Sequence, residues 1–245
     1  MKRFSVIVFL IAALVLSACN VTLDLPNVVH GSGKLATESR TVSGFTRIVV
    51  NGSGDAQITQ GDSESLSIEA EDNILPLITS DVVNGILMLG FKNNTSVSTT
   101  RPIRFTITVK SLTSIEMNGS GNSTVGDVNS DAMTMILRGS GNISLGSLQA
   151  SKLTAEDDGS GNLSVASGKI DSLSATIAGS GSFSAPDLES QDAQVSIAGS
   201  GDVTVWAKGT LQVSIFGSGS VDYFGSPTVT QNITGSGCVV SKVNK

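Results

Sequence analysis

The sequence predicts an all-β protein folded as a parallel β-helix, a β-solenoid with coils of about 20 residues. The tripeptide Gly-Ser-Gly recurs, and from Gly119 to Gly199 its starting position advances by 20 four times running, followed by two steps of 18. Apolar and polar residues alternate on both sides of each tripeptide, which is the period of a strand with one buried face. A constant interval is required when each coil hydrogen-bonds to equivalent residues of the next, whereas an antiparallel sandwich gives no reason for it.

The N-terminus has the features of a secretory signal peptide. Lys2 and Arg3 precede an uncharged apolar run, 4–16, that is shorter than the roughly 20 residues of a membrane span. The tetrapeptide Leu-Ser-Ala-Cys19 resembles the lipobox of bacterial lipoproteins, which implies cleavage before Cys19 and its acylation, palmitate included. We therefore expect a signal peptide at 1–18 and a lipidated tether at 19–40. The following Asn residue implies, by the enterobacterial sorting pattern, the outer membrane of a Gram-negative bacterium; an ordinary signal peptide is the alternative.

Composition narrows the function classes. Removing residues 1–18 changes the formal charge from −6 to −8, because Lys2 and Arg3 are lost. The remaining length suits one β-helix domain, expected at 41–245, and an acidic chain without a basic block argues against nucleic acid. With Cys19 lipidated, Cys238 is the only other thiol and His30 the only histidine. We therefore expect no intrachain disulfide, no metal site, no cofactor and no histidine-based catalytic site.

Each repeat is expected to contain a strand, a Gly-Ser-Gly corner, a second strand and a looser turn. Positions are counted back from the first glycine of a corner and forward from its last glycine; −6, −4, −2, +2 and +4 are apolar. Corner glycines are expected to have positive φ angles or to lie where a side chain would meet the neighbouring coil. Because the serine recurs in every coil, we interpret the tripeptide as architecture and not as a phosphate-binding loop. The predicted structural corners are Gly52, Gly54, Gly119, Gly121, Gly139, Gly141, Gly159, Gly161, Gly179, Gly181, Gly199, Gly201, Gly217, Gly219, Gly235 and Gly237.

The repeat is interrupted between Gly52 and Gly119, where the distance from one tripeptide to the next is more than three times the usual interval. Alternation persists there, for example at 66–70 and 103–109, so we expect about three larger coils or strands elaborated by hairpins. Residues 93–100 are rich in Asn, Ser and Thr and are expected to form an exposed loop.

A family resemblance is visible in the first part of the repeat region. The stretch Val42-Ser-Gly-Phe-Thr-Arg-Ile-Val-Val-Asn-Gly-Ser-Gly54, followed by Ile58-Thr-Gln-Gly61 and Leu66-Ser-Ile-Glu-Ala70, resembles the head GIN domain family. Those bacterial proteins are often lipoproteins and are described as "putative auto-transporter adhesins". The resemblance covers roughly residues 40–240. It implies a single-stranded right-handed β-helix with an adhesion or polysaccharide-binding role, and it supplies no catalytic residue.

An acidic cluster, Glu156, Asp157 and Asp158, suggests one alternative function. Polysaccharide-cleaving β-helix enzymes use carboxylates on an outer face, as an acid–base pair or with calcium. Asp157 falls at the inward position −2, where its counterpart is Leu137, and an inward carboxylate is costly. We therefore expect a local bulge or a slipped corner there. Arg138 and Asp158 both occupy position −1 and are expected to form a surface ion pair.

Three aromatic residues near the C-terminus are the candidate ligand-binding residues. Trp206 and Phe224 both lie at position +5 in successive coils, and Phe216 lies between them at position −1. Such rings suit a sugar platform or a partner-binding hot spot. The alternative is that they shield the open end of the solenoid, which needs a cap.

The leading hypothesis is a non-catalytic, lipid-anchored cell-envelope protein that binds a cell-surface glycan or protein. The first alternative is a polysaccharide lyase or glycoside hydrolase on a β-helix scaffold. The second is a structural component of envelope assembly that forms oligomers through the end of its solenoid.

Overall fold

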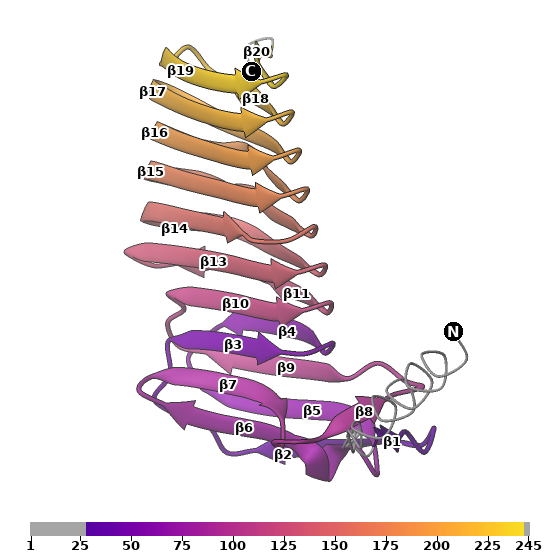
Figure 1. Cartoon of the computed structure of the whole chain (residues 1–245). Helices are drawn as coiled ribbons and strands as arrows, with labels where there is room; N and C mark the ends of the chain where they lie inside the picture. Colours follow the sequence, from indigo (N-terminus) through magenta and orange to yellow (C-terminus); the bar gives the residue numbers. More distant parts are fainter. Residues whose placement is uncertain (1–27, 243–245) are drawn as a thin grey trace, which may run out of the picture.

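The computed structural model describes residues 28–242, which form one solenoid (Figure 1). In Figure 1 the front strands from β3 to β19 run from left to right, and the chain crosses to the back at the Gly-Ser-Gly corners and, from β10 on, returns one level higher. This path is a right-handed parallel β-helix, so the predicted fold class is confirmed. The expected signal peptide, Cys19 and residues 19–27 of the expected tether lie outside the described residues. Within 28–242 no helix has both the length and the apolar character that a membrane span needs.

The strands form two facing sheets joined at the corners. The front sheet consists mainly of the strands that run toward each corner. These are β7 (Ile86–Phe91), β3 (Arg47–Asn51), β10 (Ser114–Gly119), β13 (Ala132–Gly139), the second halves of β14 (Asn142–Asp157), β15 (Asn162–Gly179), β16 (Ser182–Gly199) and β17 (Asp202–Gly217), and β19 (Thr228–Gly235). Strand β6 (Ile78–Val83) adds to this sheet in the opposite direction. The back sheet consists mainly of strands that run away from the corner side. These are β2 (Leu35–Arg40), β9 (Arg104–Val109), β4 (Asp55–Gln60), β11 (Asn122–Val125), the first halves of β14 to β17, β18 (Ser220–Phe224) and β20 (Cys238–Ser241). Strand β5 (Ser65–Glu71) lies between β2 and β9 and runs in the opposite direction. The short strand β12 (Val128–Asn129) adds to β14 on the side opposite the corners, which we call the turn side.

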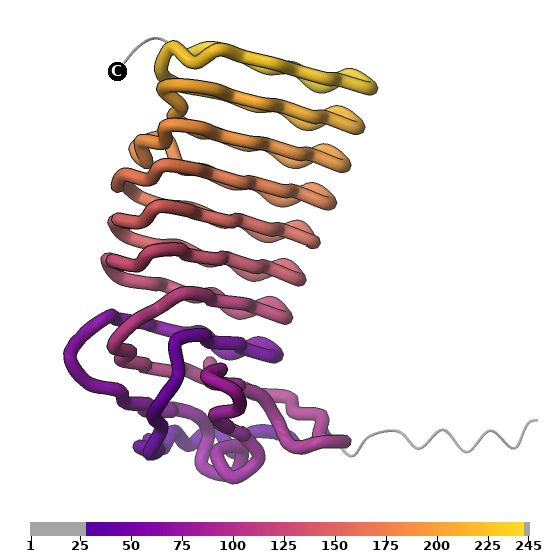
Figure 2. The backbone as a smooth tube through the Cα atoms, turned by 90° about the vertical axis from the view of Figure 1, so that its left-hand side faces the viewer, coloured from indigo at the N-terminus to yellow at the C-terminus, as the bar shows by residue number. Residues whose placement is uncertain are grey.

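Equivalent residues of successive coils stack in rows. Leu137 pairs with Asp157, which pairs with Ile177, which pairs with Ile197, each one repeat further along the chain. Ile197 then pairs with Ile215 after a shorter repeat, because the register shifts near Glu189 and Ser190 on the turn side. All four apolar members of this row are fully buried. Figure 2 shows the resulting coils as parallel rungs, with a less regular indigo and purple N-terminal part.

Stacking also explains why the corners contain glycine. Gly199 has a φ of 141°, in the region that L side chains rarely adopt, and a β-carbon there would overlap the carbonyl oxygen of Gly179. The third residue of the same corner, Gly201, has the same steric conflict with Gly181. The backbone N–H of the intervening Ser200 donates to Gly179 O at 2.9 Å, so the serine contributes a rung of the backbone ladder.

The interrupted segment forms an N-terminal cap. Strands β6 and β7 form an antiparallel hairpin, as the alternation predicts, around Asn84 and Gly85, whose φ angles are 51° and 75°. Strand β5 runs antiparallel to both β2 and β9, and a single 3₁₀ turn, η1 (Leu75–Leu77), precedes β6. Part of the predicted exposed loop, 93–100, instead forms the strand β8 (Ser96–Ser98).

The folded domain begins before the expected boundary at residue 41. Strand β1 (Val28–His30) pairs with β8, and β2 lies within the expected tether yet pairs with β5. The buried carboxylate of Glu71 secures this segment, because it accepts hydrogen bonds from Gly33 N at 2.6 Å and from the Thr100 hydroxyl at 2.6 Å. The Thr100 hydroxyl is the first of several donors that lower the pKa of Glu71 below its usual value. Gly31 permits this arrangement, since a β-carbon at that position would overlap the carboxylate.

Candidate binding surface

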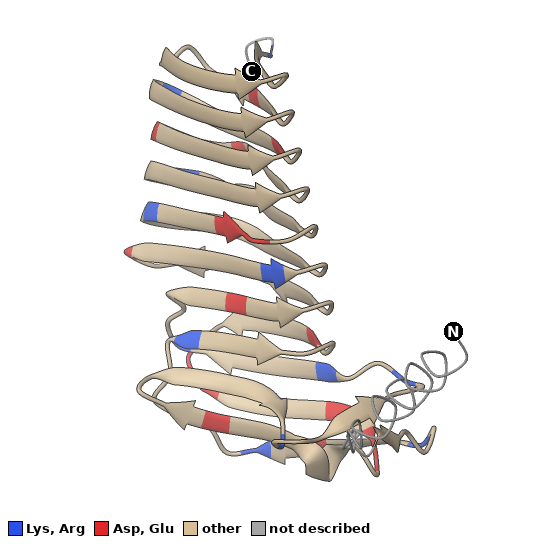
Figure 3. Ribbon diagram, viewed as in Figure 1, with Lys and Arg blue, Asp and Glu red and all other residues tan. Residues whose placement is uncertain are grey.

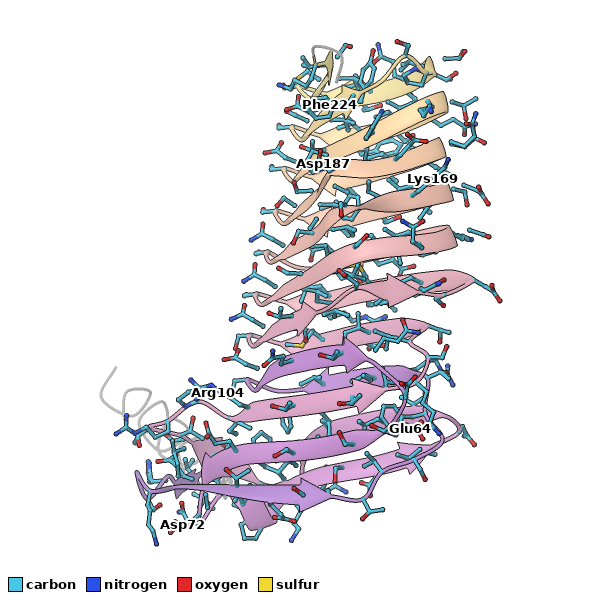
Figure 4. All side chains as sticks on the ribbon, turned by 180° about the vertical axis from the view of Figure 1, so that it is seen from behind. Glu64, Asp72, Arg104, Lys169, Asp187 and Phe224 are labelled. Atoms are coloured by element: carbon cyan, nitrogen blue, oxygen red, sulfur yellow. The ribbon has the colours of Figure 1, made fainter. Side chains whose placement is uncertain are left out.

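The structure separates the three candidate aromatic residues into two locations. Trp206 is paired in register with Phe224, and both are half-buried where the chain leaves the back sheet for the turn side. Figure 4 shows Phe224 and Asp187 on this rear side of the solenoid. Phe216 lies instead at the corner end of the front strand, about 20 Å along β17 from Thr210. The last described coil is made of β19 and β20, so strands and not these rings cover the C-terminal end.

Phe216 is the most exposed of the large hydrophobic side chains in the described part of the chain, with 54% of its surface accessible. Its neighbours in the adjacent coils are Ala198 and Thr234, both of which also point outward. Gln212 and Ser214 precede it on the same strand and, at alternate positions, share its outward face. Phe216 therefore belongs to the outer surface of the front sheet.

That surface is uncharged in the C-terminal coils, and we call it the neutral face. It comprises the outward residues of β15, β16, β17 and β19 at positions −5, −3 and −1: Ser174, Thr176, Ala178, Gln194, Ser196, Ala198, Gln212, Ser214, Phe216, Thr230, Asn232 and Thr234. Figure 3 shows this stretch in tan, above the charged strands of the earlier coils. The charges of these coils lie elsewhere. On the turn side Lys169 and Lys208 approach Glu189 at 3.7 and 3.3 Å, and on the back sheet Asp202 and Asp222 lie on β17 and β18.

Two shallow grooves cross the neutral face along the solenoid axis. One, of about 310 Å³, lies between the −5 and −3 rows and is lined by Gln194, Ser196, Gln212, Ser214 and Asn232, among others. The other, of about 270 Å³, lies between the −7 and −5 rows, with Lys152 and Asp192 at its outer margin. Gln194 and Gln212 line both grooves and form the ridge between them.

A larger cleft, of about 750 Å³, lies on the turn side at the start of β10 and β13. Arg47 and Asp131 supply its charged groups, and the rest of its lining is mainly hydroxyl and amide side chains. The Arg47 guanidinium donates to Asn84 O at 3.0 Å, so it is fixed by the hairpin turn. Sequence reasoning missed this cleft because it is built from turn residues outside the repeat positions.

Asp157 points into the core, in register with Leu137 and Ile177, and is fully buried. The expected bulge or slipped corner is therefore wrong: the stacked ladder on both sides holds the residue inward. Neither carboxylate oxygen has a hydrogen-bond partner. Burial raises the pKa of Asp157 to about 6, with Asp158 adding to the shift and the Gly159 backbone opposing it.

The predicted ion pair between Arg138 and Asp158 is confirmed at 3.5 Å, and Arg138 also contacts Glu116. All three side chains are partly solvent-exposed, so the pair adds less than about 1 kcal/mol to stability. The acidic cluster thus has one carboxylate inside the core and one engaged by an arginine. No group of three or more His, Cys, Asp or Glu side chains within 28–242 is arranged to hold a metal ion.

The sequence and the fold are both similar to those of known proteins. A family profile described as "Putative auto-transporter adhesin, head GIN domain" matches residues 44–227. The solved structure of a "putative adhesin" from Bacteroides fragilis is 27% identical, with a TM-score of 0.83 over 87% of this chain and 100% of that one. A "putative lipid binding protein" from Parabacteroides distasonis is 26% identical, with a TM-score of 0.75 over 88% of this chain and 100% of that one.

A "putative adhesin" from Parabacteroides merdae, 23% identical with a TM-score of 0.68 over 88% of this chain and 99% of that one, shares the fold. No curated protein matches the sequence.

Proposed function

This chain belongs to the head GIN domain family, described as "Putative auto-transporter adhesin", and from that membership we propose that it is a non-catalytic adhesin anchored to the cell envelope by a lipid on Cys19. The match spans residues 44–227, which includes every strand from β3 to β18 and leaves out β1, β2 and the last coil. An adhesin-like or binding role follows from the family. The lipid anchor, the outer membrane as its location and a glycan or protein as the ligand are our proposal.

The geometry of the solenoid suits presentation of a binding surface away from a membrane. Strands β1 and β2 lie at the N-terminal end of the stack, and the neutral face lies at the other end (Figure 1). Six coil steps separate β10 from β19, which is about 29 Å at roughly 4.8 Å per step. An anchor on Cys19 would therefore hold the N-terminal cap near the membrane and project the C-terminal coils outward.

The hydrolase or lyase alternative has weaker support from the side chains. Catalysis by paired carboxylates needs two outward groups on either side of a bound sugar. Asp157 faces the core, and Asp158 is paired with Arg138. Incubation of the protein with acidic and neutral polysaccharides should release no new chain ends; their release would contradict the non-catalytic proposal.

The anchor is tested by a Cys19→Ser variant expressed beside the wild-type chain in a Gram-negative host. We expect the wild type to incorporate labelled palmitate and to enter the detergent phase of a Triton X-114 partition. The variant should do neither. A Cys238→Ser variant is the matched control, because it removes the other thiol and should leave labelling unchanged. Labelling that persists in Cys19→Ser would refute the anchor.

The binding role is tested by adhesion of whole cells to immobilised glycans and extracellular-matrix proteins. Cells that display the wild-type protein should adhere to at least one of these surfaces, and cells with the Cys19→Ser variant should lose that adhesion. Equal adhesion with and without the protein would refute the adhesin proposal.

A further inference from the structure

Amide side chains on the two sheets have different hydrogen-bonding states. On the back sheet, Asn162 Nδ2 donates to Asn142 Oδ1 at 2.9 Å, and the hydroxyl of Ser182 donates to Asn162 Oδ1 at 2.6 Å. The side chains of that row therefore hydrogen-bond to one another from coil to coil. On the neutral face, the side chains of Gln194 and Gln212 make no hydrogen bond to any residue within 28–242. Their donors and acceptors are available to a ligand.

From these observations we infer that the neutral face binds an uncharged polysaccharide, laid along the solenoid axis between the glutamine ridge at position −5 and the Phe216 ring at position −1. The inference rests on the proposed binding function and names its ligand class and site. A glutamine amide carries both donors and an acceptor, so it can bind a hydroxyl group in either sense. Because the coils are about 4.8 Å apart, a chain along the axis meets an equivalent polar group at each coil.

Phe216 supplies the apolar contact that sugar rings require. Its ring is 54% exposed, and the positions beneath it in the two earlier coils are the small residues Ala198 and Ala178. Small neighbours leave open space beside the ring. An exposed ring bordered by hydroxyl and amide groups fits a ligand that has both apolar faces and polar edges.

The charge of the surface selects among glycans. None of the outward residues of β15, β16, β17 and β19 at positions −5, −3 and −1 is charged. A uronic-acid or sulfated polysaccharide would lose hydration at this face without gaining a cation, and the nearest margin carries Asp192 as well as Lys152. A neutral polysaccharide has no such penalty.

A peptide or a lipid surface fits the same face less well. The backbone N–H and C=O groups of β15, β16 and β17 are paired with strands on both edges, so a peptide laid across these strands gains no main-chain hydrogen bonds. Phe216 is the single large apolar side chain of the face, which is too little to insert into a bilayer.

The test uses the full mature protein in detergent micelles, probed by affinity electrophoresis in gels containing mannan, dextran, a neutral β-glucan, polygalacturonate or heparin. We expect retardation by at least one neutral polysaccharide and by neither acidic one. The Phe216→Ala and Gln212→Ala variants should each weaken that binding about tenfold or more. Both residues are exposed, so circular dichroism and the melting temperature should match the wild type.

Two control variants lie outside the neutral face. Gln149→Ala removes an exposed glutamine of β14 near the turn side, and Phe224→Ala removes a ring of the rear aromatic pair. Both should bind like the wild type. If Phe224→Ala abolishes binding while Phe216→Ala does not, the neutral face is refuted as the site although the adhesin proposal stands.

Retardation by acidic polysaccharides alone, or by none of the five, would also overturn the inference. Whole-cell adhesion to proteins would then still support the adhesin proposal, whereas an absence of any adhesion would refute both.

Discussion

The carboxylate of Asp157 occupies the space that a β-carbon on Gly181 of the following coil would fill. Apolar residues make the same contact elsewhere: Leu137 lies against Gly161, and Ile177 lies against Gly201. The side chain at position −2 therefore packs onto the last corner glycine of the next coil. Asp157 is the one charged residue in this apolar row, and its site can accept leucine or isoleucine without a change in the backbone.

Replacing Asp157 with leucine should stabilise the protein at neutral pH. The substitution removes a buried carboxylate without hydrogen-bond partners and restores the side chain of the preceding coil. We expect the free energy of unfolding to rise by roughly 1 to 3 kcal/mol at pH 7. Urea denaturation followed by circular dichroism measures it, and a destabilised variant would contradict our account of the row.

The stability of the wild-type protein should also depend on the protonation of Asp157. Its pKa is about 6 in the folded chain and 3.8 ordinarily, so the folded state binds this proton more tightly than the unfolded state. The contribution is complete below about pH 4 and is lost as the pH rises through 6. Relative to Asp157→Asn, the wild type should therefore lose roughly 1 to 3 kcal/mol between about pH 4 and pH 7.5. Parallel unfolding curves for the two proteins at every pH would show that the carboxylate is hydrated.

The corner residue Gly201 should be far less tolerant of substitution than Gly126, where a β-carbon has room. In a Gly201→Ala variant the new β-carbon would overlap the Gly181 carbonyl oxygen, so we expect a loss of about 2 kcal/mol or more. Gly126→Ala is the control, because the nearest atom to its new β-carbon is Ile58 O at 3.7 Å. Thermal melts of both variants measure the difference. Equal melting temperatures would mean that the backbone at the corners adjusts to the added β-carbon.

Replacing Glu71 with glutamine should loosen the N-terminal cap while leaving the C-terminal coils intact. The change removes the charge that strengthens the bonds from Gly33 and Thr100 to the carboxylate. We expect faster amide hydrogen exchange in β1 and β8, with unchanged exchange in β15 and β16. Because the pKa of Glu71 is lowered, the wild-type protein should show the same local loosening as the pH falls through that value. Uniform exchange changes over the whole chain would contradict a local role.

The stacking of equivalent residues could be predicted from the sequence because a constant interval determines the register. The row through Leu137, Ile177 and Ile197 follows from counting alone. The same counting placed Asp157 in this row, and the expectation of a bulge failed because the cost of one buried carboxylate is smaller than the cost of breaking the ladder on both sides. The position of Asp157 in the stacked row therefore determines that its side chain points inward, although the residue is polar.

Features built from different rows were harder to predict. The sequence contains Trp206, Phe216 and Phe224 close together, but the path of the chain around the turn at 207–209 separates Phe216 from the other two. To predict the neutral face, one must know which rows of residues lie on the same sheet. The pairing of β1 and β2 with distant strands carries no repeat signal, so residues before 41 were expected to be a tether.

The two sides of the solenoid differ in how much variation in length they accept. Gly199 stacks on Gly179 after a full-length repeat, and Gly217 stacks on Gly199 after a shorter one, with the same corner geometry. The difference in length is absorbed at the register shift on the turn side. Insertions and deletions can therefore accumulate on the turn side while the glycine edge keeps its spacing. A recognition loop or an epitope tag grafted there would be carried by the stack without disturbing it, whereas the same graft at a corner would prevent adjacent coils from meeting.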